Sequence, residues 1–270
     1  MARPPLDLMA GIALAAGERI LAYYDPAGSA SRTKEDGSPV TAADEAAEAL
    51  ILERLAAAGV TAVVAEESVA AGRVPEIGST FALVDPLDGT KEFVSGSGEF
   101  TVNIAWIEDG RPVAGVVLAP AVGVVFGGDE TGAWRASVSG GAMGAPETIR
   151  AVVPAQGLRV VASRSHLTPE TKAFVERYSV ASFVSSGSSL KFCRVAEGAA
   201  DLYPRLGRTM EWDTAAGHAV LLAAGGSVST LDGKPLTYGK AAAEDGAFAN
   251  PHFVAAGAFD PFALARQRAG

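Results

Sequence analysis

Disulfide bonds and membrane spans are the first features that the sequence lacks. It contains one cysteine in 270 residues, Cys193, so no intramolecular disulfide can form and a reducing cytoplasm is the expected environment. Apolar neighbours surround Cys193, which predicts a buried structural thiol rather than a nucleophile. No apolar run reaches the ~18 residues that a membrane helix needs, so the sequence predicts no transmembrane segment. A cytoplasmic protein is expected, with peripheral association at the inner membrane left open.

Basic runs are missing as well. The chain has 22 Lys and Arg against 31 Asp and Glu, a net charge of −9, which excludes a polymeric nucleic acid as the expected partner. A small anionic ligand is still permitted, because cations bound to acidic side chains reverse the local field. The few histidines (His166, His218 and His252) do not have the spacing of a shared metal site. His166 and His218 are instead candidates for lining a substrate pocket.

Helical and strand patterns divide the chain into two parts. Residues 7–24 and 41–58 have the periodicity of helices, and the second is expected to begin with Thr41 as N-cap and Asp44 in its first turn. Apolar and alternating strand patterns dominate residues 60–137, where Asp109-Gly110 predicts a hairpin. Helices packed on a largely antiparallel sheet are therefore expected in an N-terminal α+β part, residues 1–150.

Strands and helices alternate after about residue 155, which is typical of an α/β arrangement. A helix is expected after Thr168 as N-cap and Pro169 at the first position, and another in "GSSLKFCRVAEG". A further helix is expected over "EWDTAAGHAVLLAAGG", from Glu211 to the paired glycines. These elements form a predicted C-terminal α/β part, residues 151–270. Trp212 is expected in the core more than as a platform for a stacked base.

The stretch "DPLDGTKEF" places two carboxylates, Asp85 and Asp88, around a proline. Asp-Pro-Leu-Asp fits a type I turn, whose ends lie within ~7 Å, so both carboxylates and the Leu87 carbonyl can converge. Two carboxylates this close need a shared proton or a cation. Their hard oxygen ligands suit Mg²⁺. The N–H groups of Gly89 and Thr90 are then candidates for receiving phosphate oxygens.

Other acidic residues occupy similar positions at the ends of predicted elements. Glu66-Glu67 ends a strand, Asp44 opens a helix, and Asp213 begins another. A surface turn carrying acids by chance would explain Asp-Pro-Leu-Asp-Gly equally well if it stood alone. The repeated placement of acids favours a metal cluster.

Four motifs, in order and spacing, resemble the inositol monophosphatase superfamily of Mg²⁺-dependent, lithium-sensitive phosphatases. They are "SPVTAAD", "AEES", "DPLDGTKEF" and "EWDTAAGHAVL", and the resemblance spans roughly residues 7–260. Ala65 is a departure, because the family often has glycine there. The resemblance implies a layered αβαβα sandwich. An oligomeric state of monomer or homodimer is compatible with it.

The resemblance also implies roles for the acidic residues. Glu66, Asp85 and the Leu87 carbonyl would hold one Mg²⁺, and Asp85, Asp88 and Asp213 a second, with a third ion entering alongside the substrate. Asp44 and Thr90 would position and activate the attacking water, with Glu67 as outer support. Two metal ions would then stabilise the attacking and leaving oxygens of an in-line displacement.

Lys91-Glu92-Phe93, which follows Thr90, resembles the bacterial 3'(2'),5'-bisphosphate nucleotidase branch, whose role lies in sulfur assimilation. This similarity implies hydrolysis of the 3'-phosphate of adenosine 3',5'-bisphosphate to give AMP. Inositol-1-monophosphatase, or another small phosphate-ester phosphatase, is the alternative. A metal-binding or nucleotide-binding regulator without activity is a second class, which loss of a site residue would favour.

Residues for the retained phosphate are expected outside the acidic motifs. The candidates for substrate contact are Gly89, Thr90, Arg164, Gly187, Ser188, Lys191 and Asp213. A helix N-terminus binds anions, which favours the serine-rich turn before Lys191. Solvated surface charges are the alternative interpretation of Arg164 and Lys191. Loop 26–39 is expected to close over the site, with Lys34 or Asp36 taking part.

Overall fold

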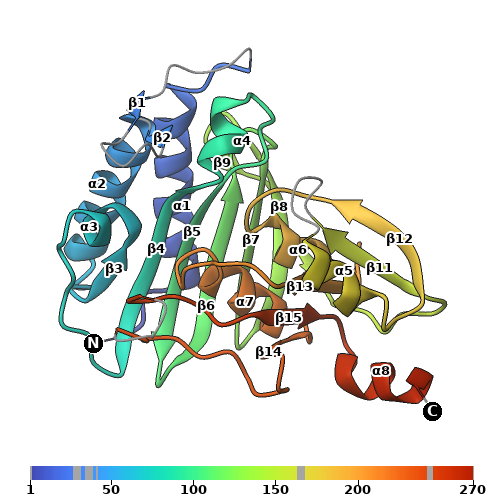
Figure 1. Cartoon of the computed structure of the whole chain (residues 1–270). Coiled ribbons are helices and arrows are strands. Elements are labelled where there is room, and N and C mark those ends of the chain that lie inside the picture. Colours follow the sequence, from blue (N-terminus) through green and yellow to red (C-terminus); the bar gives the residue numbers. More distant parts are fainter. Residues whose placement is uncertain are drawn as a thin grey trace.

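The computed structural model of the chain describes residues 2–26, 32–33, 39–40, 42–162, 168–241 and 246–269. Its elements form five layers, helices–sheet–helices–sheet–helices, which confirms the predicted αβαβα sandwich (Figure 1). The helices are α1 (Leu6–Leu21), α2 (Ala42–Ala57), α3 (Glu66–Ala70), α4 (Thr90–Val94), α5 (Pro169–Val175), α6 (Leu190–Ala196), α7 (Ala215–Ala223) and α8 (Pro261–Ala269). No helix within the described ranges is long and apolar enough to cross a membrane.

The larger sheet has the strand order β10-β8-β7-β6-β5-β4-β3, with β9 beside β8. Its strands are β3 (Val63–Ala65), β4 (Thr80–Asp88), β5 (Thr101–Glu108), β6 (Arg111–Ala119), β7 (Val124–Asp129), β8 (Gly132–Ser139), β9 (Ala142–Met143) and β10 (Glu147–Ile149). Among the described strands of this sheet, only β3 and β4 pair in parallel, so the expectation of a largely antiparallel sheet is confirmed. The predicted hairpin joins β5 to β6, where Asp109 and Gly110 both have positive φ (48° and 74°).

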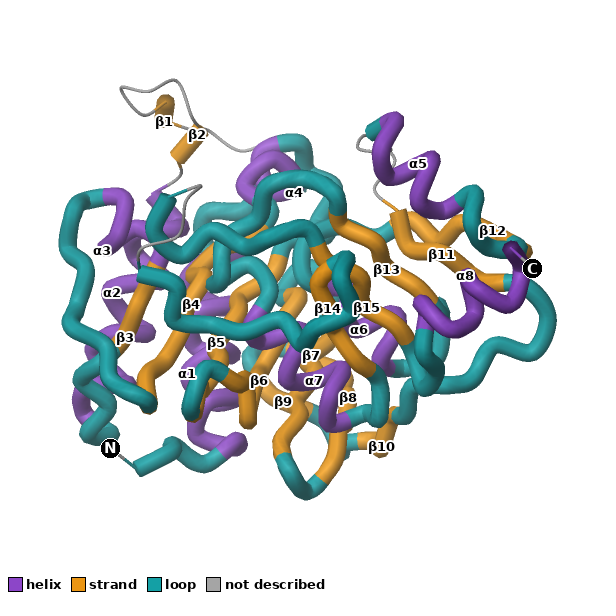
Figure 2. The backbone as a smooth tube through the Cα atoms, turned by 60° about the horizontal axis from the view of Figure 1, so that its bottom comes forward, coloured by secondary structure: helices purple, strands orange, loops and turns teal. Residues whose placement is uncertain are grey.

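The smaller sheet has the order β12-β11-β13-β15-β14 (Figure 2). Its strands are β11 (Leu158–Ala162), β12 (Val180–Ser185), β13 (Leu202–Arg205), β14 (Ser227–Thr230) and β15 (Phe253–Ala256). Pairing is parallel around β11 and antiparallel around β15, so the C-terminal part contains a mixed sheet. A short antiparallel pair, β1 (Arg32–Thr33) with β2 (Pro39–Val40), lies apart from both sheets.

Strand alternation assigns the two faces of the larger sheet. Val102, Ile104 and Trp106 of β5 face the core that contains α1 and α2, whereas Ala105 and Ile107 face the core that contains α6 and α7. All five side chains are buried. The second core also receives β11, β13 and β15 of the smaller sheet, so α6 and α7 form the central layer between the sheets (Figure 1).

Helix α7 lies unusually close to the larger sheet because both surfaces are built from small residues. A Cβ on Gly115 of β6 would be 2.6 Å from the Ala216 carbonyl oxygen, and one on Gly128 of β7 would be 2.8 Å from the Val220 Cα. A Cβ on Gly217 would be 2.7 Å from the Phe192 ring of α6. Contacts with the α7 backbone therefore fix its distance from the larger sheet, whereas the Phe192 side chain packs against Gly217.

Candidate functional site

A bulge in β4 directs Asp85 and Asp88 to one face of the sheet. Asp85 pairs with Asn103 and Asp88 with Thr101, so three steps along β4 match two along β5. In a regular strand, residues three apart would point to opposite faces, and the extra residue of the bulge removes that difference. The Asp-Pro-Leu-Asp segment is thus a bulged strand end rather than the predicted type I turn. Pro86 lacks an N–H group and is tolerated there because a bulge interrupts the ladder.

Gly89 carries the chain from β4 into α4. Its φ is 93°, in the left-handed region, and a Cβ would lie 2.1 Å from the Ser188 hydroxyl oxygen. The Ser188 hydroxyl lies 3.0 Å from the Asp88 carbonyl and 2.9 Å from the Glu99 carbonyl, and it can donate to both. A hydroxyl that we predicted to contact substrate therefore holds the backbone of the acidic motif. Substrate contact by Ser188 stays a prediction.

Five of the six predicted acidic site residues lie close enough together to affect one another's pKa. Burial raises the pKa of Asp85 well above its ordinary value, and Glu66, Asp88, Asp213 and Asp44 raise it further. Burial likewise raises the pKa of Asp213, followed by the charge of Asp88. The carboxylates thus disfavour one another's ionisation, and their full charge at neutral pH requires a compensating cation.

The donor set fits a divalent cation by its chemistry. Within the described ranges, no group of three or more His, Cys, Asp or Glu side chains is arranged to hold a metal ion. The interacting groups are nevertheless carboxylates, which are oxygen ligands that Mg²⁺ prefers. A divalent cation would also offset the repulsion that raises the pKa of Asp85 and Asp213. The individual ligand assignments stay predictions.

Lys191 supplies a cation beside these acids. It is 9% exposed, its Nζ donates to the Ser188 carbonyl at 3.0 Å, and it lies 5.8 Å from the centre of the Tyr203 ring. Burial lowers the pKa of Lys191, whereas the Asp88 carboxylate raises it. The pKa of Asp88 is raised by burial, and Lys191 opposes that rise. The alternative interpretation of Lys191 as a solvated surface charge is therefore wrong.

A cavity of about 140 Å³ opens where the two parts of the chain meet. Asp88, Gly89, Ser188, Lys191 and Asp213 are the predicted site residues that line it. The remaining lining residues are Lys91, Glu92, Phe192, Tyr203, Arg205, Thr209 and Thr214. Other predicted residues do not line the cavity: Asp44, Glu66, Glu67, Asp85, Leu87, Thr90 and Gly187. Arg164, His166, Lys34, Asp36 and Thr41 lie outside the described residues.

Ser189 connects the acids of β4 to Asp213. Its hydroxyl accepts a hydrogen bond from the Asn103 side-chain amide at 3.0 Å and donates to the Asp213 carbonyl at 2.7 Å. Asn103 is the residue of β5 that pairs with Asp85. Sequence reasoning missed this link, because its members are 86 and 24 positions apart.

Glu48 was also missed. This buried side chain of α2 accepts hydrogen bonds from the Glu67 backbone N–H at 2.8 Å and from the Ser68 hydroxyl at 2.7 Å. It therefore fixes the start of α3, where Glu66 lies, relative to Asp44 one helical turn earlier in α2. Two acids four positions apart in an alanine-rich helix were the available sign of this role.

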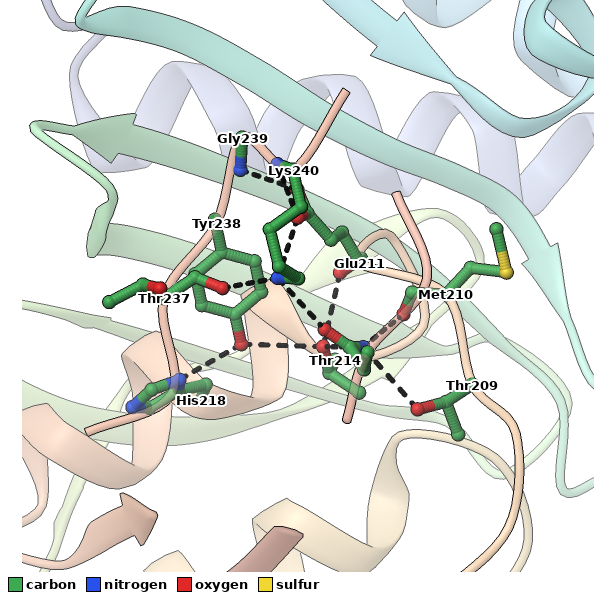
Figure 3. A network of polar contacts seen from close by, with 10 residues as sticks. Thr209, Met210, Glu211, Thr214, His218, Thr237, Tyr238, Gly239 and Lys240 are labelled. Atoms are coloured by element: carbon green, nitrogen blue, oxygen red, sulfur yellow. Dashed lines mark hydrogen bonds and ion pairs between the residues drawn. The ribbon is translucent and has the colours of Figure 1, made fainter. Parts of the chain in front are cut away.

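Asp213 lies in a turn rather than in the predicted helix, because α7 begins at Ala215. The Asp213 carboxylate accepts a hydrogen bond from the Met210 N–H at 2.8 Å. Just before it, the fully buried Glu211 accepts from the N–H groups of Gly239 and Lys240 at 2.7 and 2.8 Å and pairs with the Lys240 ammonium at 2.7 Å (Figure 3). These donors compensate the buried charge and hold the turn that carries Asp213.

His218 and Trp212 belong to the core beside the site. The His218 ring nitrogen lies 2.9 Å from the Tyr238 hydroxyl (Figure 3), and His218 is not among the residues that line the cavity. Burial, with a smaller effect of Arg111, lowers the pKa of His218 to about 3. Its predicted position in the pocket is therefore wrong. Trp212 is buried against Phe248, and Cys193 is buried, as predicted.

Comparison with known proteins adds to this geometry. The model of the inositol monophosphatase family matches residues 5–258. The 3'(2'),5'-bisphosphate nucleotidase CysQ of Shigella flexneri is 44% identical over 240 residues, and that of Escherichia coli strain K12 is 45% identical over 237. Each alignment covers 86% of this chain and 93% of the relative.

Solved structures agree with the sequence comparison. CysQ from Bacteroides thetaiotaomicron, described as a bacterial member of the inositol monophosphatase family, has a TM-score of 0.77 and 38% identity. The match covers 94% of this chain and 98% of that one. An inositol monophosphatase of Thermotoga maritima, at 24% identity and a TM-score of 0.74 with 98% and 96% coverage, supports the fold alone. The similarity extends over both sheets and the helical layer between them.

Proposed function

The chain belongs to the inositol monophosphatase family, and from that premise we propose that it is a Mg²⁺-dependent phosphatase that converts adenosine 3',5'-bisphosphate to AMP and phosphate. The observation that carries the substrate is the 44–46% identity, over 86% of the chain, to relatives named 3'(2'),5'-bisphosphate nucleotidase. The convergence of buried carboxylates beside a lysine-lined cavity supports the same chemistry from the structure.

Two or three Mg²⁺ ions would be held by Glu66, Asp85, the Leu87 carbonyl, Asp88 and Asp213. When bound, Mg²⁺ neutralises phosphate charge and makes a coordinated water more acidic. The repulsion among these carboxylates is the physical reason for requiring cations. Inhibition by lithium is expected as part of the same proposal.

The residues of the chain have separate tasks in this proposal. Asp44, in the first turn of α2, and Thr90, at the start of α4, orient the attacking water and accept its proton. Glu67 supports Thr90 and Asp44 from α3. Gly89 keeps the backbone within reach of the phosphate, because no Cβ covers it. Lys191 contributes positive charge at the cavity wall and favours binding of an anionic substrate.

Phosphate release from adenosine 3',5'-bisphosphate and from inositol 1-phosphate, measured side by side with Mg²⁺ and with EDTA, tests this function. We expect release from the nucleotide that EDTA abolishes and that Asp88→Asn reduces by about 100-fold or more. Asp7→Asn, at an exposed position of α1, is the matched control and should retain activity. A preference for the inositol ester would replace the proposed substrate. No release from either ester would favour a binding protein without activity.

A further inference from the structure

A later part of the sequence pairs with the turn that carries Asp213. It comprises residues 237–241 and 246–250, which we call the strap, and Ala249 of the strap forms an isolated antiparallel bridge with Met210. Two further backbone hydrogen bonds, at 2.8 and 2.9 Å, lie on either side of this bridge. The strap is therefore attached to the segment that leads directly into Asp213.

Asn250 is the strap side chain that contacts this turn most extensively, and it is 6% exposed. Its amide nitrogen donates to the Met210 carbonyl at 2.7 Å and to the Thr214 hydroxyl at 3.0 Å, and its amide oxygen accepts from the Lys240 ammonium at 3.5 Å. A carbonyl can only accept and an ammonium can only donate, so these partners determine the orientation of the amide. Asn250 thus connects the residues on both sides of Asp213.

Met210 transmits this contact to the Asp213 side chain. The Met210 carbonyl accepts the hydrogen bond from Asn250, and the Met210 N–H donates to the Asp213 carboxylate at 2.8 Å. Because both groups belong to the backbone of one residue, a shift of the carbonyl displaces the donor that orients the carboxylate. Asp213 lines the cavity of the site and Asn250 does not. Asn250 can therefore affect the site through the turn rather than by contact with a ligand in the cavity.

Backbone strain occurs in the strap two residues before Asn250. Phe248 has a φ of 62°, in the left-handed region that bulky residues rarely adopt, and its side chain is fully buried. The Phe248 carbonyl accepts from the Glu211 N–H at 2.8 Å, and the Phe248 N–H donates to the Lys240 carbonyl at 2.9 Å. Strained residues persist where the surrounding contacts fix them, and they cluster at functional sites. These bonds hold the strap, and with it Asn250, in one position against the turn.

We propose that Asn250 is a positioning residue for Asp213: by holding Met210 and Thr214, it keeps the Asp213 carboxylate in the orientation that binds a divalent cation. This inference rests on the proposed function, in which Asp213 is a ligand of the second Mg²⁺. Side chains that orient metal ligands without touching the metal typically contribute about 10- to 100-fold to metal affinity. Loss of the Asn250 donors should therefore weaken the Mg²⁺ site that contains Asp213.

Calorimetric titration with Mg²⁺ alone, in the absence of substrate, tests the proposal. Asn250→Asp keeps the shape of the side chain but removes both N–H donors. Its added negative charge would by itself favour Mg²⁺, so weaker binding in this variant cannot be an effect of charge. Asn250→Ala removes the donors without adding charge. We expect both variants to bind Mg²⁺ roughly 10-fold more weakly than the wild type, and an affinity within about twofold of the wild type in both would overturn the proposal.

A double-mutant cycle separates positioning from a general loss of stability. If Asn250 acts through Asp213, Asn250→Ala should cause no further loss of Mg²⁺ affinity when it is added to Asp213→Asn. Ile12→Val, a substitution at a buried position of α1, is the control: it should lower the melting temperature and leave Mg²⁺ affinity unchanged. Additive losses of affinity in the cycle would contradict positioning through Asp213.

The metal titration also distinguishes this inference from the proposed function, because it needs no substrate. A wild type that binds Mg²⁺ more tightly than both Asn250 variants, but releases phosphate from neither ester, would keep the positioning role and reject the activity. An active wild type whose Asn250 variants bind Mg²⁺ equally well would keep the activity and reject the positioning role.

Discussion

His218 shows how one buried side chain links the stability of the fold to pH. Its folded pKa of about 3 lies below the ordinary value of 6.5. As pH falls below 6.5, the unfolded state binds a proton that the folded state does not, so the free energy of unfolding falls. Above pH 6.5 both states are neutral at this residue and it has no effect.

We therefore expect His218 to cost the wild type about 1.4 kcal/mol of unfolding free energy between pH 7.5 and 5.5. Urea denaturation at both pH values, compared with His218→Gln, measures the difference. The raised pKa values of Asp85 and Asp213 act in the opposite direction. Because these two residues bind protons more readily in the folded state than in the unfolded state, acidification raises the free energy of unfolding through them. Both proteins share that effect, so the comparison removes it. The same pH dependence in both proteins would contradict the assignment to His218.

At the scale of elements, the contact between α2 and α3 orders the predicted ligands. The almost fully buried Glu48 carboxylate accepts hydrogen bonds from two donors at the start of α3. Glu48→Ala leaves the Glu67 N–H and the Ser68 hydroxyl without their acceptor, so we expect a loss of about 1–3 kcal/mol in unfolding free energy. Glu48→Gln retains one carbonyl acceptor and should lose less.

Chemical denaturation, together with the Mg²⁺ concentration for half-maximal activity, would check this prediction. A displaced α3 should raise that Mg²⁺ concentration in Glu48→Ala, because Glu66 is the first residue of α3. Glu45→Gln, on the same helix, is the control for loss of an acid from α2. Unchanged Mg²⁺ dependence in Glu48→Ala would mean that Glu48 supports stability alone.

Elements with local causes were predictable from the sequence. Thr168 accepts a hydrogen bond from the Thr171 N–H, with Pro169 at the first helical position, as its sequence pattern indicated. Rules based on neighbouring residues failed where a contact with another segment determines the local structure. The bulge at Asp85–Asp88 depends on the register with β5, and the late start of α7 depends on the side-chain hydrogen bond within Met210–Asp213. The Ser189 link joins three segments and has no local pattern.

At the scale of the whole molecule, repulsion among the buried carboxylates is expected to lower the stability of the fold, and a bound divalent cation would restore it. Asp85 is buried among like charges, so Asp85→Asn should raise the melting temperature in EDTA, since the amide retains an acceptor for the Leu87 N–H. Mg²⁺ should stabilise the wild type, by about 2.7 kcal/mol at 100 times its dissociation constant, and should stabilise the variant less. Thermal melts of both proteins with EDTA and with Mg²⁺ measure this reversal. A variant that melts below the wild type in EDTA would contradict the repulsion.

The close packing of α7 against the larger sheet restricts the movements that are open to the molecule. Gly115 and Gly128 bring the larger sheet against the α7 backbone, and Gly217 lets the Phe192 ring of α6 pack against the same helix. A movement of α7 relative to the larger sheet would have to break the contacts at Gly115 and Gly128, which side-chain rearrangement cannot absorb. We therefore expect Asp213, two residues before α7, to keep its distance from the β4 acids during turnover. Substrate entry and product release must use local movements at the cavity mouth, and the turnover rate should respond to changes there rather than to domain opening.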